Sequence, residues 1–149
     1  MDFSFTDDEL ALRESVRDFA RKELAPRAQA LDESAEFLAE HLPKLAGMGI
    51  MGMNLPEAWG GAGIPALALS LAVEELAGAC AATASTVTAH FLATDTILLG
   101  GDDGLKRRYL PDAAAGRTLG AFALTEPEAG SNPAEMRMRA AREGDGYHL

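Results

Sequence analysis

The amino-acid sequence predicts a mainly α protein, with about five helices followed by the first strands of an incomplete β domain. Its 149 residues are 48% hydrophobic and only 6% aromatic, and much of the apolar fraction is alanine, which loses little on entering a helix. Apolar residues recur at helical spacing in most of residues 1–116. After Gly116 short apolar runs bounded by turn residues replace that pattern. We therefore expect a helical domain at 1–116 and the start of a β domain at 117–149.

The first helix has a clear beginning in the sequence. Thr6 and Glu9 form the spacing of a capping box, in which each side chain bonds the other residue's backbone N–H. Pro26 disfavours helical geometry in the residue before it. We therefore predict a helix over about residues 7–25, with one apolar stripe made of Leu12, Val16, Phe19, Ala20 and Leu24.

The second predicted helix covers about residues 36–46. Pro43 either kinks this helix or marks the first turn of a shorter one. Residues 50–63 follow, rich in glycine, and we predict an interhelical loop in which Trp59 packs against the core. A phosphate-binding loop is the less favoured alternative, because no strand precedes the segment and no Lys-Ser/Thr pair follows it.

Three more helices are expected at about residues 65–78, 82–99 and 103–114. The middle one is apolar nearly all round, which is typical of a helix buried in a bundle, and Pro111 can shorten the last. Residues 118–124 are then predicted as a buried strand. Residues 144–146, Gly-Asp-Gly, are predicted as a hairpin turn that leads into a second strand at Tyr147.

Charge, cysteine content and the lack of targeting segments indicate which partners and which compartment to expect. The formal net charge is −10, which disfavours binding to nucleic acid and to anionic membranes. Cys80 is the only cysteine, so no intrachain disulfide can form, as suits a reducing cytoplasm. Residues 1–9 lack the basic and apolar regions of a signal peptide, and no apolar run is long enough to span a bilayer. We expect a cytoplasmic protein with no nucleic acid and no membrane among its partners.

Several kinds of catalytic site are not indicated. His41, His90 and His148 are scattered, so we expect no metal site. Ser131 lacks the glycine pattern of a nucleophile elbow, and no Gly-x-Gly-x-x-Gly run follows a strand to bind a nicotinamide nucleotide. What remains is the strand-to-loop passage at 122–132. Its small and polar residues can direct backbone N–H groups and hydroxyls at a flat ligand with a polar edge, or they can form an ordinary surface turn.

Residues 124–132, LTEPEAGSN, resemble the signature of the acyl-CoA dehydrogenase family, whose usual form is Thr-Glu-Pro, a variable residue, then Ala-Gly-Ser-Asp. Asn132 stands where the family usually has aspartate, and Glu128 fills the variable position. The resemblance extends over essentially the whole chain. It includes FTDDELALRESVRDFARKELAP at 5–26, LAGMGIMGMNLPEAWGGAG at 45–63, LAVEELAG at 71–78 and KRRYLPDAAAGRTLGAFALTEP at 106–127.

The resemblance implies an N-terminal helical domain, a middle β-barrel domain and a C-terminal four-helix bundle. This chain would supply the first domain and the first strands of the barrel, as an N-terminal fragment. The implied activity is FAD-dependent α,β-desaturation of an acyl-CoA in fatty acid or amino acid catabolism, with an electron-transfer flavoprotein reoxidising the flavin and a homo-oligomeric full-length form. The catalytic carboxylate is expected beyond Leu149, so the isolated chain would contain no catalytic residue and would be inactive.

The resemblance also implies roles for particular residues. Phe122, Leu124 and Thr125 would line the flavin ring, and the threonine hydroxyl would bond its polar edge. Gly130 and Ser131 would lie by the FAD pyrophosphate, and Ser131 would also touch the CoA portion of the substrate.

Other expectations concern neighbouring positions. The helix around residues 90–96 would help to wall the acyl cavity, with His90 in packing or a local hydrogen bond. Glu126 would shape the backbone and would not act as the base. Two alternatives remain open: a flavin monooxygenase or oxidase of the same fold, and a non-catalytic helical domain, left by truncation, that binds a partner chain.

Overall fold

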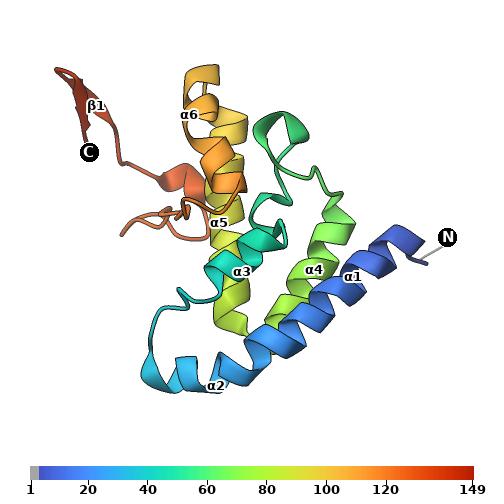
Figure 1. Ribbon diagram of the computed structural model, residues 1–149. Helices are drawn as coiled ribbons and strands as arrows, with labels where there is room; N and C mark the ends of the chain where they lie inside the picture. The colour runs from blue at the N-terminus through green and yellow to red at the C-terminus, as the bar shows by residue number, and fades with distance from the viewer. Residues whose placement is uncertain (1–3) are drawn as a thin grey trace.

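The mainly α fold class is confirmed by the computed structural model, which describes residues 4–149 (Figure 1). Residues 1–3, on which part of the expectation about a signal peptide rests, lie outside the described residues. The helices are α1 (Asp7–Phe19), α2 (Ala25–Ser34), α3 (Leu42–Gly47), α4 (Ala66–Ala79), α5 (Ala81–Gly100) and α6 (Asp103–Ala114), and the strands are β1 (Ala141–Glu143) and β2 (Gly146–His148).

The capping box at the start of α1 is confirmed. The Thr6 backbone N–H donates to Glu9 Oε2 at 2.8 Å, and the Glu9 backbone N–H donates to Thr6 Oγ1 at 3.2 Å. Two backbone donors that a helix start leaves without intrahelical partners are thereby satisfied.

The prediction that Pro26 ends this helix is wrong. A π-helical turn, η1 (Ala20–Leu24), joins α1 to α2, and the Ala25 N–H bonds back five residues to the Ala20 carbonyl. Pro26 then lies in the first turn of α2, where its fixed φ suits the helix. The helical path therefore continues to Ser34 and ends at Ala35, whose backbone is left-handed with φ of 54°.

The predicted helix over 36–46 is reduced to α3, with Pro43 in its first turn. This agrees with the shorter-helix alternative, because proline fixes a helical φ but cannot continue a ladder that precedes it. The interhelical loop that follows contains two 3₁₀ turns, η2 (Ile50–Gly52) and η3 (Glu57–Trp59). Trp59 packs on a small cluster of Leu55, Leu110 and Ala114, as expected for a packing residue.

The main core lies between α1, α4 and α5. Its buried residues share an apolar side chain and come from α1, α3, α4, α5 and the turns and loops that join the helices: Val16, Ala20, Leu24, Leu45, Ile50, Met51, Met53, Ala72, Leu76, Cys80, Ala84, Val87 and Phe91. Helix α5 is buried along one side only, and Leu92 and Leu99 on the other are 52% and 85% exposed. The expectation that α5 is enclosed on all sides is not met by residues 4–149.

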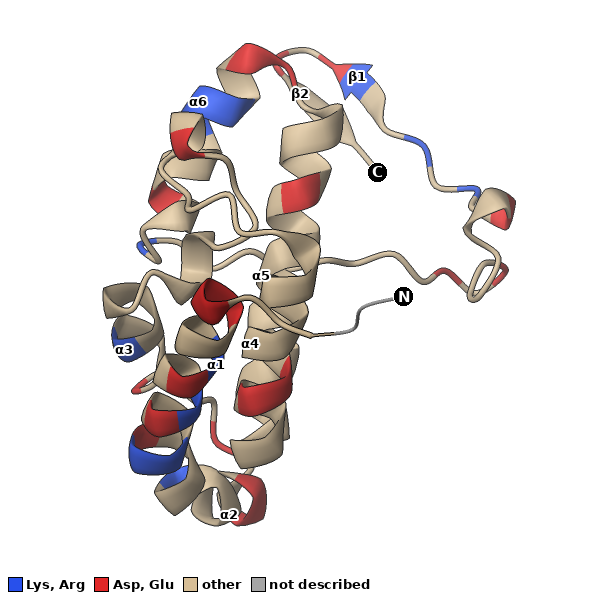
Figure 2. Ribbon diagram, turned by 90° about the vertical axis from the view of Figure 1, so that its right-hand side faces the viewer, with Lys and Arg blue, Asp and Glu red and all other residues tan. Residues whose placement is uncertain are grey.

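The predicted strand over 118–124 is wrong. These residues form no strand and are exposed or half-buried, and Figure 2 shows the chain crossing α5 and then leaving the helices as an extended arm. A strand requires a neighbour that pairs its backbone groups, and residues 4–149 place none beside this segment. Farther on, the hairpin turn is confirmed, since β1 and β2 pair antiparallel with Glu143 opposite Gly146. The division at residue 116 stays a prediction.

Candidate functional site

Residues 120–131 are here called the arm, and the five residues predicted to bind a cofactor all lie on it. Residues 121–125 are called the extended segment. Phe122 and Leu124 are both 39% exposed, and Thr125 is exposed as well. Within residues 4–149, the backbone groups of this segment make no hydrogen bond. Large apolar side chains beside unpaired backbone donors and acceptors suit a flat ligand with a polar edge.

The extended segment leads into a tight loop at 126–131, here called the turn loop. The Glu126 N–H donates to the Ala129 carbonyl at 2.9 Å, and the Ala129 N–H returns a bond to the Glu126 carbonyl at 3.2 Å. The Glu126 carboxylate also accepts the backbone N–H groups of Arg137 at 2.8 Å and Met138 at 3.1 Å. These contacts give Glu126 the backbone-shaping role expected from the sequence.

Gly130 and Ser131 follow this closure and are both exposed. A Cβ placed on Gly130 would meet no atom within 4 Å among residues 4–149, so packing inside this chain does not require glycine there. A ligand that approached the protein backbone closely at this point would require glycine. Asn132 caps the short turn that follows it, because its Oδ1 accepts the Ala134 N–H at 3.3 Å while its Nδ2 donates to Glu135 Oε1 at 3.0 Å.

His90 joins the start of the arm to the helices. Its side chain is 0% exposed, Nε2 lies 3.1 Å from the Met51 carbonyl oxygen, and Nδ1 accepts the Gly120 backbone N–H at 2.9 Å. Burial lowers the pKa of His90, against the opposing effect of nearby backbone carbonyls. His90 is therefore a hydrogen-bonding residue, but its partners Met51 and Gly120 are distant in sequence and not local as expected.

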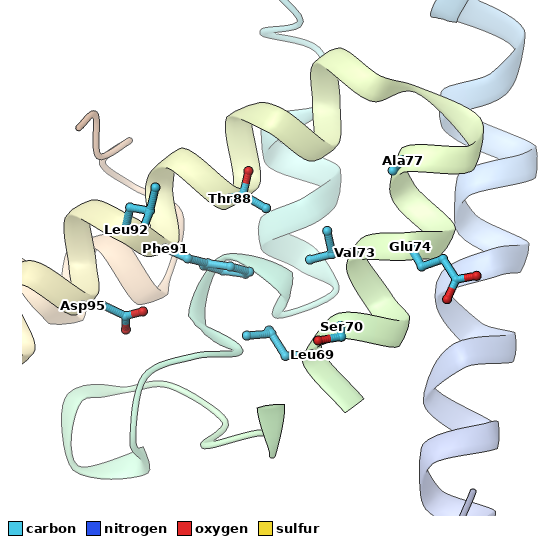
Figure 3. A pocket seen from close by; sticks show the side chains of 9 residues that line it. All are labelled: Leu69, Ser70, Val73, Glu74, Ala77, Thr88, Phe91, Leu92 and Asp95. Carbon is cyan, nitrogen blue, oxygen red and sulfur yellow. The ribbon is translucent and has the colours of Figure 1, made fainter. Parts of the chain in front are cut away.

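A groove of about 540 Å³ lies between α4 and α5, and we call it the α4–α5 groove (Figure 3). Figure 3 shows Val73 and Phe91 facing each other across it, with the Glu74 carboxylate turned away. Phe91, Leu92 and Asp95 on its α5 side fall within residues 90–96, which were expected to help wall the acyl cavity, and that role stays a prediction. The α4 side was not expected. Leu69 and Val73 have helical spacing, which by itself does not distinguish a core stripe from the wall of a groove. The lining residues are Leu69, Ser70, Val73, Glu74, Ala77, Thr88, Phe91, Leu92 and Asp95.

Asn54, in the glycine-rich loop, bonds two residues of α5 next to this groove. Its Nδ2 donates to Thr94 Oγ1 at 2.9 Å and to Asp95 Oδ1 at 2.7 Å. The loop is thereby tied to α5, and the one carboxylate that α5 contributes to the groove is fixed in place. No signal in the sequence singled out Asn54, because its partners lie about forty residues farther along the chain.

Residues 4–149 show no arrangement for a metal ion or a membrane span. No group of three or more His, Cys, Asp or Glu side chains is placed to hold a metal ion. No helix in this range combines the length and the apolar character that crossing a membrane requires.

Comparison with known proteins identifies relatives along the whole chain. Residues 6–117 match the family model described as acyl-CoA dehydrogenase, N-terminal domain. An acyl-CoA dehydrogenase of Bacillus subtilis (strain 168) is 38% identical over 145 residues, which cover 97% of this chain and 38% of that protein. An acryloyl-CoA reductase (NADH) of Anaerotignum propionicum is 39% identical over 140 residues, covering 94% of this chain and 36% of that protein.

The fold also matches solved structures. A glutaryl-CoA dehydrogenase from Mycobacterium smegmatis, solved in complex with FADH2, superposes with a TM-score of 0.86 at 36% identity, covering 94% of this chain and 36% of that one. The chain thus spans less than two fifths of the length of these relatives.

Proposed function

Because this chain belongs to the acyl-CoA dehydrogenase family, we propose that it forms part of an FAD-dependent enzyme that desaturates an acyl-CoA thioester between its α and β carbons. The observation that carries this proposal is the extended segment, which offers exposed apolar side chains and unpaired backbone groups. The turn loop follows it, and the Glu126 carboxylate holds that loop in shape.

The residues of the arm fit the chemistry of FAD. Phe122 and Leu124 would pack on the flavin ring, and Thr125 with the neighbouring backbone would bond its polar edge. Gly130 and Ser131 would approach the pyrophosphate, where the absence of a Cβ at Gly130 leaves room. When bound, FAD supplies the acceptor for the hydride that leaves the acyl β carbon.

The α4–α5 groove supports the choice of substrate class. Phe91 and Leu92 on α5 face Leu69 and Val73 on α4, and an apolar wall of this kind suits an acyl chain and excludes water. Ser131 would contact the CoA portion, which carries the polar and charged groups of the thioester.

We place the base that removes the α proton outside residues 1–149. The Glu126 carboxylate already accepts two backbone N–H groups, and these hydrogen bonds use the oxygens that a base needs. We further propose that an electron-transfer flavoprotein reoxidises the flavin and that the full-length protein is a homo-oligomer.

A fusion protein tests the proposal. Residues 1–149 replace the matching segment of the Bacillus subtilis relative, here called the fusion, and its flavin content is measured together with bleaching by acyl-CoA without oxygen. We expect a yellow fusion that acyl-CoA bleaches, whereas residues 1–149 alone retain no stoichiometric FAD. A folded but colourless fusion would exclude the flavin role of the arm.

A second candidate is the reverse reaction, reduction of an enoyl-CoA. It is favoured by one observation, the 39% identity to the acryloyl-CoA reductase. The same fusion separates the two, because a reductase reoxidises its reduced flavin with enoyl-CoA faster than with an electron-transfer flavoprotein. Consumption of oxygen with incorporation into the substrate would indicate a monooxygenase.

A further inference from the structure

Three segments distant in sequence meet at the imidazole of His90. The ring belongs to α5 and is fully buried. Its Nε2 lies 3.1 Å from the carbonyl oxygen of Met51 in η2, and its Nδ1 lies 2.9 Å from the backbone nitrogen of Gly120 at the start of the arm. Both ring nitrogens are therefore used in hydrogen bonds between elements.

The partners fix where the ring proton lies. A backbone N–H can only donate, so Nδ1 must accept from Gly120 and carries no proton. A carbonyl oxygen can only accept, so Nε2 carries the proton and donates to Met51. The neutral Nε2–H tautomer alone satisfies both bonds, because a second proton on Nδ1 would face the Gly120 N–H.

The arm passes in direct contact with α5 at this point. A Cβ on Gly120 would lie 2.7 Å from Ala93 Cβ and 3.4 Å from His90 Nδ1, so only glycine lets the backbone come this close. Among residues 4–149, the extended segment that follows makes no backbone hydrogen bond before Glu126. The bond to His90 is thus the polar contact that sets where the extended segment begins.

We infer that His90 is a positioning residue, whose Nδ1 fixes the extended segment against α5. The next two residues of the same helix, Phe91 and Leu92, line the α4–α5 groove. One rigid helix thereby sets the distance between that groove and the side chains of Phe122 and Leu124. The role rests on the proposed function, in which the groove takes the acyl chain and the extended segment takes the flavin.

Two substitutions separate positioning from packing. In the His90→Asn variant, the amide oxygen lies near the position of Nδ1. This variant therefore keeps an acceptor for the Gly120 N–H but loses the donor to the Met51 carbonyl. In the His90→Gln variant, the amide nitrogen reaches the position of Nε2. This variant therefore keeps the donor to the Met51 carbonyl but loses the acceptor for the Gly120 N–H. Both variants remove the ring, and a residue that merely fills space would respond equally to both.

The first readout is amide exchange in residues 1–149, which needs no flavin. We expect exchange at Gly120 to remain close to wild type in His90→Asn and to rise roughly tenfold in His90→Gln, the fold-change that loss of one hydrogen bond produces. We also expect a scalar coupling between Gly120 N and His90 Nδ1 in the wild-type chain. Equal exchange in the two variants, or no coupling in the wild type, would overturn the inference.

The second readout is the rate at which saturating acyl-CoA bleaches the fusion. We expect the bleaching rate to be lower in His90→Gln than in His90→Asn, because the flavin is displaced from the groove. The substrate affinity and the Tm of the two variants should be the same. Equal rates in two folded variants would overturn the positioning role. If the wild-type fusion is colourless, the proposed function fails, and exchange at Gly120 still decides the role of His90.

Discussion

Arg17 on α1 and Glu75 on α4 form a two-point ion pair. Arg17 Nη2 donates to Glu75 Oε1 at 2.7 Å, and Arg17 Nε donates to Oε2 at 3.0 Å. Arg13, one turn earlier on α1, adds a bond to Oε1 at 2.7 Å. Two arginines on one helix thus enclose one carboxylate on its neighbour, and the contact joins the two helices beside the core.

Replacing Glu75 tests the strength of this ion pair. We expect Glu75→Gln to lower the free energy of unfolding by about 1–2 kcal/mol, because two partly buried guanidinium groups lose their charged partner. Urea denaturation measures the effect. Lys22→Ala is the control, since the Lys22–Asp18 pair is 71% and 56% exposed and its loss should cost less than about 0.5 kcal/mol. Equal losses in the two variants would contradict the prediction.

The same carboxylate makes stability depend on pH. Hydrogen bonds from Arg17 and then Arg13 outweigh burial and lower the pKa of Glu75 from 4.5 to about 2. Because the folded-state pKa is depressed, the contribution is fully present above pH 4.5 and is lost as pH falls toward about 2. The difference in unfolding free energy between wild type and Glu75→Gln should therefore shrink across that window. A constant difference from pH 6 to pH 2 would contradict the assigned cause.

Two glycines with opposite surroundings give a packing prediction. A Cβ on Gly61 would lie 2.0 Å from the Leu55 carbonyl oxygen, whereas one on Gly78, inside α4, would meet nothing within 4 Å among residues 4–149. We expect Gly61→Ala to destabilise the fold by about 3 kcal/mol or more, and Gly78→Ala to stabilise it by about 0.5–1 kcal/mol. Thermal unfolding of both variants measures this. A stable Gly61→Ala variant would show that the loop can shift.

Local signals predicted the helices well and failed where the outcome depended on distant residues. The predicted limits of α6 match the structure, and Pro111 does not shorten it. The continuation through Pro26 was missed because a π-helical turn has no local sequence signature. The strand at 118–124 was predicted from its apolar run, but strand formation requires a partner that the run cannot specify.

The candidate site shows the same division. The turn chemistry of residues 126–132 could be read locally, including the capping by Asn132. The contact between His90 and Gly120 joins residues thirty positions apart, and neither residue type identifies the other. A buried histidine has many possible partners, so its role required the fold.

Glu126 gives the last prediction, which separates a structural carboxylate from a catalytic one. In the fusion, Glu126→Gln keeps one oxygen that can accept the backbone N–H of Arg137 or Met138. Glu126→Ala keeps no side-chain acceptor. We expect Glu126→Gln to retain most of the acyl-CoA bleaching rate and Glu126→Ala to lose flavin as the turn loop opens. A general base would instead lose about 10²- to 10⁴-fold in rate on either substitution with flavin still bound. That loss in Glu126→Gln, at full flavin content, would show that Glu126 takes the α proton.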